Sequence, residues 1–453
     1  MIAIQETLER VLRLSSADAC IAIARRHTTV NVRWANNTAT TNGSAEQISL
    51  SIVSIVGRQV GSVTRTYFPP ESLEAMVRES EAACKGNPAA ADYVPLIQGH
   101  GEPDDWHAPA AATDIKVFAD FAPALSAMFQ RARTADLLTF GYAEHGASTV
   151  WLATSTGVRR RYSDRIGKVE VTGKTCDFSR SSWTGQATHN FQDVDPETII
   201  GTLEQRLAWS RRRIDMPAGH YEVLFEPSAT ADLALGAYGF MIRRDADEGR
   251  SPYSSPHGGT RIGERLFGDV TMYSDPREGG VETAPFQLAA GSTGASSVFD
   301  NGLPIARTEW VRDGELRALI TPRFWAATAG IGEIPYVDNL IVAGNGPTMA
   351  QMIAETKRAL LVTCLWYIRT VDPQTALLTG LTRDGVFLIE NGEVQGAVNN
   401  FRWNMSPIAA LAQATQIGRT GMALPREDDE FLRAKAPPLR VDRFSMSSVS
   451  EAV

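Results

Sequence analysis

The first half of the chain shows one order of predicted elements twice, and this repeat constrains the fold more than any single motif. In each copy a helix with one apolar face comes first, strand-like runs follow, and a second helix closes the set. The predicted helices cover residues 5–13 and 69–84 in the first copy, and 113–131 and 195–207 in the second. The strand-like runs cover 20–26, 30–34, 47–56 and 59–66, and then 137–145, 149–153, 158–162, 169–178 and 183–188. We therefore expect a duplicated unit of helices and antiparallel sheet in an α+β fold.

The composition changes after Met216-Pro217-Ala218-Gly219, where the chain becomes richer in glycine and mostly strand-like. Residues 250–275 are expected to form a long ordered loop, 347–360 a helix, and 436–444 a last edge strand. Asn391-Gly392 predicts a β-hairpin, because both residues tolerate positive φ. A chain of 453 residues is too long for one core. We predict an N-terminal α+β domain at 1–108, a central α+β domain at 109–217 and a β-rich C-terminal domain at 218–453.

Composition excludes some classes of protein. The net charge of −8 argues against a nucleic-acid binder, and the short basic run Arg159-Arg160-Arg161 is expected on a solvated strand face. The start, MIAIQETLER, lacks the basic and apolar regions of a secretory leader, and no apolar stretch is long enough to cross a bilayer. The four cysteines form no CxxC pair, so we expect buried thiols in a cytoplasmic protein.

Residues 220–245 predict a strand followed directly by a helix. The strand covers 221–226, Pro227 and Ser228 break it, and the helix begins near Ser228. Leu233, Gly236, Ala237 and Phe240 are spaced to form an inner, apolar face. This helix is therefore expected to lie in the core of the third domain.

Several short blocks, spread over nearly the whole chain, carry a family resemblance. The most specific is Asp372-Pro373-Gln374-Thr375, followed by a hairpin that contains Ile389-Glu390-Asn391-Gly392-Glu393. The other blocks are Asn42-Gly43 ahead of the strands at 47–66, Val337-Asp338-Asn339-Leu340, and Gly344-Asn345-Gly346. Together they resemble the TldD/TldE family, also called PmbA or modulator-of-DNA-gyrase proteins. Ala376 stands where this family usually has Gly, and 377–382 departs from the usual pattern.

The resemblance implies a zinc site in one branch of the family and its loss in this chain. In the TldD branch, the helix near Ser228 carries HExxxH, and zinc is also held by a cysteine near the C-terminus. Laid onto that motif without gaps, the first His falls at Leu235, the Glu at Gly236 and the second His at Phe240. These residues offer no zinc ligand and no base. Cys364 precedes the hairpin block, whereas the TldD cysteine follows it, so we expect no metal ligand and no catalytic residue here.

The missing motif is typical of the TldE branch. The resemblance implies that TldD and TldE act together as a cytoplasmic zinc protease that trims flexible peptides, and that TldE completes the peptide-binding chamber. We therefore expect no cofactor in this chain, and zinc in a TldD-like partner that bears HExxxH. An extended peptide would be held by strand addition, in which backbone hydrogen bonds provide the affinity. A homodimer is a further option when the partner is absent.

Two alternatives remain open at this point. An independently active metallopeptidase would need atypical ligands, for which the candidates are His220, His257, Asp245, Asp247 and Glu248. No two of the histidines share one helix at ligand spacing, which disfavours this alternative. A protein that binds gyrase or DNA is disfavoured by the acidic charge and by the lack of a basic amphipathic helix.

Overall fold

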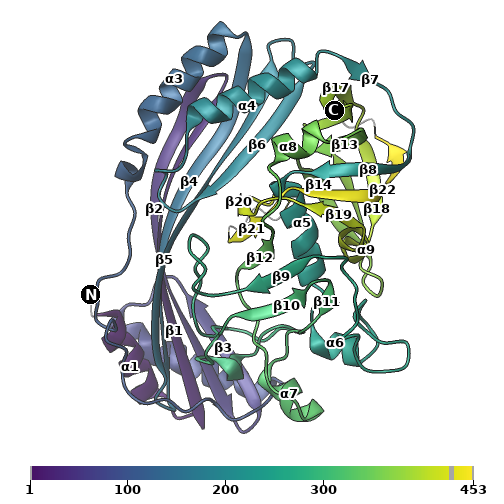
Figure 1. Cartoon of the computed structure of the whole chain (residues 1–453). Coiled ribbons are helices and arrows are strands. Elements are labelled where there is room, and N and C mark those ends of the chain that lie inside the picture. Colours follow the sequence, from purple (N-terminus) through teal and green to yellow (C-terminus); the bar gives the residue numbers. More distant parts are fainter. Residues whose placement is uncertain (1–2, 428–432, 451–453) are drawn as a thin grey trace.

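The computed structural model describes residues 3–427 and 433–450 and has the predicted α+β architecture (Figure 1). Within residues 19–188, all of which are described, the strands of both repeats form one antiparallel six-stranded sheet in the order β3-β2-β1-β4-β5-β6. The repeats therefore meet where β1 pairs with β4. The strands are β1 Ala19–Ala35, β2 Thr38–Val56, β3 Gln59–Arg65, β4 Leu137–Thr154, β5 Arg159–Thr175 and β6 Ser181–Thr188. The repeated order of helix, strands and helix is confirmed.

Three of these strands are longer than the sequence predicted. β1 joins the runs at 20–26 and 30–34, β4 joins those at 137–145 and 149–153, and β5 joins the next two. No proline separates these runs, so the pairing with neighbouring strands continues through them. Where β1 does end, Asn36 and Asn37 have φ of 51° and 58°, which asparagine tolerates better than most residues.

Four helices cover one face of this sheet (Figure 1). They are α1 Ile4–Leu14, α2 Leu73–Gly86, α3 Phe121–Thr134 and α4 Pro196–Trp209. α1 and α2 bury Leu8 and Val77 against one part of the sheet, and α3 and α4 bury Leu125 and Leu203 against the other. Alternate residues of β1, from Cys20 to Trp34, supply the sheet side of both clusters, as strand geometry requires.

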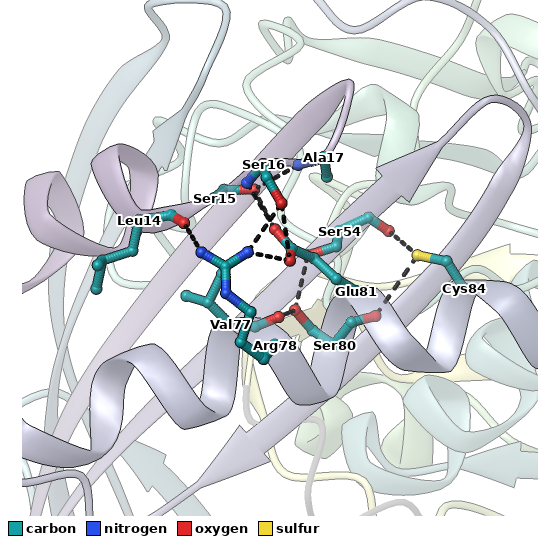
Figure 2. Close-up of polar contacts among 10 residues, drawn as sticks. All are labelled: Leu14, Ser15, Ser16, Ala17, Ser54, Val77, Arg78, Ser80, Glu81 and Cys84. Carbon is teal, nitrogen blue, oxygen red and sulfur yellow. Dashed lines mark hydrogen bonds and ion pairs between the residues drawn. The ribbon is translucent and has the colours of Figure 1, made fainter.

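A hydrogen-bond network fastens the end of α1 to α2 (Figure 2). The Glu81 carboxylate accepts from the backbone N–H of Ser16 at 2.7 Å and is also paired with Arg78. Arg78 in turn donates to the carbonyl of Leu14 at 2.6 Å. Burial alone would raise the pKa of Glu81, but these donors outweigh burial and the pKa lies below its ordinary value. The orphan carbonyl at the end of α1 is thereby satisfied.

The basic run at 159–161 does not lie on a solvated face, so that prediction was wrong. Arg159 donates to both oxygens of Glu9 on α1, at 2.6 and 2.9 Å. Arg161, whose side chain is 6% exposed, donates to Asp105 at 2.8 Å and lies over the ring of Trp151. Helix α1 and the loop at 87–114 return over this strand, which local sequence does not reveal.

The C-terminal half contains two further sheets around a central helix, α5 (Pro227–Tyr238). One sheet has the order β11-β10-β9-β12-β21-β20, formed by β9 Thr271–Ser274, β10 Thr308–Arg312, β11 Glu315–Leu316, β12 Leu340–Ala343, β20 Gly421–Ala423 and β21 Ala434–Ala436. The other has the order β14-β15-β18-β22-β8-β13-β16-β17-β7, and β19 pairs with β22. Its strands are β7 Arg213–Ile214, β8 Gly219–Phe225, β13 Arg358–Val362, β14 Leu365–Asp372, β15 Leu377–Thr382, β16 Val386–Glu390, β17 Glu393–Val398, β18 Phe401–Met405, β19 Ala414–Ile417 and β22 Leu439–Val449.

The described residues of this half also form four shorter α-helices: α6 Arg243–Asp247, α7 Arg323–Ala329, α8 Met349–Ala354 and α9 Pro407–Ala412. The helix predicted at 347–360 is thus correct only in its first part. Thr348 and Gln351 form a capping box that starts α8, whereas the apolar run of Leu360, Leu361 and Val362 joins a sheet between β8 and β16. None of the helices in the described residues is long and apolar enough to cross a lipid bilayer.

Other predictions for this half have mixed outcomes. The hairpin at Asn391-Gly392 is confirmed, with φ of 51° and 83°, and the loop at 250–275 has no regular element before β9. The last strand, β22, is not an edge strand, because it pairs with both β8 and β18. The prolines at 437 and 438 lie ahead of β22 and remove no hydrogen bond from its pairing with either neighbour.

The C-terminal half packs on the first sheet, against the face that lies opposite the four helices (Figure 1). Ile21, Ile23 and Leu152 of the sheet contact Phe286 and Phe299 of the C-terminal half in one apolar cluster. Further along the same face the sheet carries polar side chains, and a cavity lies between the halves. The domain boundaries at 108 and 217 stay predictions.

Candidate functional site

Helix α5 is the element on which the sequence places the degenerate motif. β8 ends at Phe225, Glu226 is extended at the N-cap with φ −70° and ψ 162°, and Pro227 occupies the first turn, where it needs no hydrogen-bond partner. Buried residues occur on every side of the helix: Ala229, Thr230, Ala231, Asp232, Leu233, Ala234, Leu235, Ala237 and Tyr238. A helix buried all round has no face left for solvent.

The three motif positions lie among hydrocarbon side chains. Leu235 is 8% exposed and belongs to the main core cluster of this half. A Cβ added at Gly236 would lie 3.1 Å from Cδ1 of Leu378 and 3.6 Å from Cγ of Pro407, so the space beside it is filled. Phe240 lies two residues beyond the end of α5, in the turn before α6, and packs against the same cluster. The structure therefore brings Leu235 and Gly236 together on α5 and places Phe240 outside it.

These positions do not fit a zinc ion. Zinc in proteins takes nitrogen, sulfur and oxygen ligands, and the groups around Leu235 and Gly236 are carbon atoms of Leu378 and Pro407. In residues 3–427 and 433–450, no group of three or more His, Cys, Asp or Glu side chains is placed to hold a metal. The donor chemistry of α5 thus differs from that of the HExxxH helix.

A buried ion pair at the start of α5 was missed by the sequence analysis. Arg206 of α4 donates to both carboxylate oxygens of Glu226, at 2.7 and 2.6 Å, and to the carbonyl of Trp183 at 2.7 Å. Burial raises the pKa of Glu226, and the Arg206 guanidinium opposes that rise. The pair joins α4 to the residue that precedes α5. The only sequence signal was the pair Glu226-Pro227, which is also ordinary at a helix start.

A second polar group on α5 is equally well satisfied. Asp232 is 4% exposed, and its carboxylate accepts the backbone N–H groups of Arg426 and Glu427, both at 3.2 Å. The Arg426 guanidinium lies 3.8 Å above the Trp366 ring and 3.7 Å from Glu170 of β5. Residues 426 and 427 are thereby anchored to α5 and to the first sheet.

The alternative ligands do not come together. His220 is exposed on β8 opposite Ser445, and His257 is exposed in the loop after α6. Each candidate acid has an arginine partner: Asp245 with Arg250, Asp247 with Arg243 and Glu248 with Arg244, all at 2.9 Å. The acids therefore form local ion pairs near α6 and share no site with the histidines.

Cys364 is a buried packing residue in this structure. It is fully buried beside Trp183 and Leu424, and burial raises the pKa of its thiol to about 12. Cys20 and Cys84 are also buried. Cys176 is exposed, so the expectation of four buried thiols was wrong at that position.

Comparison with known proteins identifies the family. The sequence pattern of the PmbA/TldA metallopeptidase C-terminal domain matches residues 218–448, just over half of the chain. The chain belongs to the PmbA/TldD family. The resemblance carried by the blocks at 337–346 and 372–393 is thus confirmed for PmbA/TldD. No curated protein matches the chain.

Solved PmbA/TldD-like structures share the fold over nearly the whole chain. TldE from Thermococcus kodakarensis is 15% identical, with a TM-score of 0.76 over 98% of this chain and 99% of that one. A Thermotoga maritima protein, provisionally described as a modulator of a DNA gyrase, is 15% identical with a TM-score of 0.77 over 98% and 100%. A Bacteroides thetaiotaomicron protein of like description is 14% identical with a TM-score of 0.75 over 98% of each chain. At such identities the likeness shows the fold.

Proposed function

We propose that this chain is the non-catalytic, TldE-like subunit of a TldD/TldE-type zinc metalloprotease that acts on flexible peptides in the cytoplasm. The observation that carries the proposal is the hydrocarbon packing of the three motif positions. Leu235 lies in the core of the C-terminal half, half-buried Gly236 faces Leu378 and Pro407, and Phe240 lies past the end of α5. Zinc and the base that activates water would come from a TldD-like partner with an intact HExxxH.

Retention of the whole fold supports a chamber-forming role. The chain aligns with a solved TldE over 98% of its length, although the motif is absent. The polar groups close to α5, Glu226 and Asp232, are held by Arg206 and by backbone N–H groups, so they are engaged in structure. A subunit that shapes a peptide-binding chamber needs this architecture but needs no metal ligands of its own. The expected substrate is an extended peptide held through backbone hydrogen bonds.

The test compares the purified chain alone, a TldD-like HExxxH-bearing chain alone, and both together. Zinc content is measured by plasma mass spectrometry, and cleavage is followed on an unstructured peptide by mass spectrometry. We expect far less than one zinc per chain here, no cleavage by this chain alone, and cleavage when both chains are present. A matched control uses the partner with the Glu of HExxxH replaced by Gln, which should abolish cleavage by the pair.

Two outcomes would contradict the proposal. One tightly held zinc in the isolated chain, with cleavage that is lost in His257→Ala, would instead point to an independently active metallopeptidase. Salt-sensitive binding of DNA by the isolated chain would point to the gyrase- or DNA-associated alternative.

A further inference from the structure

A cavity of about 370 Å³ lies between the first sheet and the C-terminal half, away from α5. Its floor is formed by β1, β4 and β5, and its opposite wall by residues 283–288, Ile305 and the segment at 336–338. The size falls in the range of small-ligand sites. Polar groups from both halves converge on it, so we asked which ligand they would satisfy.

The acidic side chains of the cavity already have a cation. Arg433 pairs with both Asp164 and Asp338, the latter at 3.2 Å, and donates to the carbonyl of Glu282 at 3.1 Å. Its side chain is 17% exposed and that of Asp164 is 16% exposed, so this pairing is partly shielded from water. These acids therefore leave little demand for a cationic ligand.

The groups that remain without a partner are mainly donors. Arg25 is exposed and attracts Asp338 at longer range, but it forms no hydrogen bond or ion pair with the described residues, and neither do the hydroxyls of Tyr162 and Thr283. Thr283 is 5% exposed as a residue, but its hydroxyl is not among the fully buried polar atoms and still meets solvent at the cavity. An acceptor on a ligand would replace that solvent at these donors.

The strand register places these donors side by side. Arg25 on β1 and Tyr162 on β5 are both paired with Val150 of β4, so they flank it on one face of the sheet. Two strand spacings separate them by roughly 10 Å at the backbone, a span that an arginine and a tyrosine side chain can close. His27 follows Arg25 on the same face, and its Nδ1 lies 2.8 Å from the Ser148 hydroxyl.

One acceptor, carried by a largely buried side chain, also faces the cavity. Gln287 is 6% exposed, and its Nε2 donates to the carbonyl of Tyr336, which fixes the orientation of the amide. Its Oε1 has no partner within the described residues and is left as an acceptor. The remaining wall is apolar and includes Phe286 and Ile305. The cavity thus combines several donors, one acceptor and an apolar surface.

We propose that this cavity binds the C-terminal residue of a peptide that ends in an apolar amino acid. The terminal carboxylate would accept hydrogen bonds from Arg25, Tyr162 and Thr283. The amide N–H of the same residue would donate to Oε1 of Gln287, and its side chain would lie against Phe286 and Ile305. The carboxylate site stands on the cavity alone. The choice of a peptide as the carrier rests on the proposed function.

The experiment measures binding of N-terminally labelled Ala-Ala-Ala-Leu to the full wild-type chain by fluorescence anisotropy. The same peptide with an amidated C-terminus removes the charge and leaves the rest unchanged. The free acid is expected to bind roughly tenfold or more tightly than the amide, because hydrogen bonds to charged groups are the stronger ones. Equal binding of both peptides, or of neither, would overturn the proposal.

Two variants locate the site. Arg25→Gln is expected to weaken binding of the free-acid peptide roughly tenfold and to leave binding of the amidated peptide unchanged. The matched control, Arg33→Gln, removes an exposed arginine from the same face of β1, about 26 Å further along, and should change neither. Equal losses in both variants would show a non-specific charge effect and overturn the assignment. If Arg25→Gln fails to fold, the comparison of free-acid and amidated peptides on the wild-type chain still tests the carboxylate site.

A third probe separates the two sources of a carboxylate. N-acetyl-leucine presents the same carboxylate, amide and side chain without a peptide chain. Weaker competition by N-acetyl-leucine than by the unlabelled tetrapeptide supports a peptide ligand, whereas equal competition would overturn the peptide as carrier and assign the cavity to small acids. Because no partner and no zinc enter this measurement, its result is independent of the test of the proposed function.

Discussion

Helix α5 and the cavity between the halves hold their charged groups in different ways, although the Thr230 hydroxyl on α5 is itself buried without a partner. Around α5 each charged group that we describe has a close partner: Glu226 has Arg206, and Asp232 has two backbone N–H groups. In the cavity, Arg25 and the hydroxyls of Tyr162 and Thr283 have none within the described residues. Groups that are paired within the protein report on stability, whereas groups that still meet solvent in a concave site are available to a ligand. The difference directs functional experiments to the cavity and stability experiments to α5.

The contrast between the two regions would fail most directly if α5 could carry the HExxxH motif of the TldD branch. The triple variant Leu235→His, Gly236→Glu and Phe240→His is expected to lose roughly 4 kcal/mol or more of unfolding free energy, because polar groups would be buried without partners. Chemical denaturation and zinc analysis check this. Leu235→Met, which keeps the volume, is the control and should cost less than about 1.5 kcal/mol. A stable triple variant with one bound zinc would show that the core around α5 can reopen.

The pair at the start of α5 gives the next largest effect. Arg206→Met leaves the Glu226 carboxylate, whose side chain is 20% exposed, without its cation and is expected to cost roughly 2–3 kcal/mol near neutral pH. The double variant Arg206→Met with Glu226→Gln should recover most of this loss. Full stability of the single variant would mean that water reaches Glu226 and that α5 is less enclosed than described.

The same pair predicts a pH dependence with a definite sign. The pKa of Glu226 is raised in the folded chain, so the cost of keeping it ionised is present above that pKa and disappears as the pH falls toward the ordinary glutamate value. Without Arg206 this cost is larger. The stability gap between wild type and Arg206→Met should therefore narrow as the pH falls from 8 to 5, when followed by urea unfolding. A gap that widens in acid would contradict the assignment.

Within the cavity, the paired cation should matter for stability. Arg433→Gln leaves Asp164 and Asp338 without a guanidinium and is expected to cost roughly 1–3 kcal/mol by thermal unfolding. Arg65→Gln removes an exposed pair with Glu79 and serves as the control, for which about 0–1 kcal/mol is expected. Equal costs in both variants would show that the cavity is as open to water as the surface.

The smallest expected stability effect is the most informative for function. Arg25→Gln should change the free energy of unfolding by no more than about 0.5 kcal/mol, because Arg25 is exposed and forms no hydrogen bond or ion pair with the described residues. The measurement is made on the same samples as the peptide-binding assay. A large loss of stability would show that Arg25 is structural, and the contrast between the two regions would disappear.

Much of the fold could be predicted because it follows from local patterns. The repeated order of elements, the break at Pro227 and the hairpin at Asn391-Gly392 depend on periodicity and turn chemistry, and all are found. The strand-like run at 360–369 also forms strands, β13 and β14. The merging of separate runs into β1 and the end of α8 before residue 360 depend on which elements lie alongside, which local sequence does not state. Tertiary context decided those elements.

The candidate sites could be predicted only in part. Alignment to a family motif placed Leu235 and Gly236 on the correct helix, but it did not show that α5 ends before Phe240. The cavity could not be predicted, because Arg25, Tyr162 and Gln287 are more than a hundred residues apart in sequence and meet only through the strand register and the packing of the two halves. Residue-spacing patterns predict which side chains share a face of one helix or strand, and they do not predict contacts between segments so far apart in sequence.

The strand order of the first sheet has a practical consequence for dissection of the protein. β1 pairs with β4 from Ile21 to Trp34. A fragment that stops at residue 108 lacks β4, so β1 would become a long, unpaired edge strand. Such a piece is expected to aggregate when expressed by itself. A single proteolytic cut in the loop at 87–114, by contrast, should leave two polypeptides that stay associated through the β1–β4 pairing and elute together in size-exclusion chromatography.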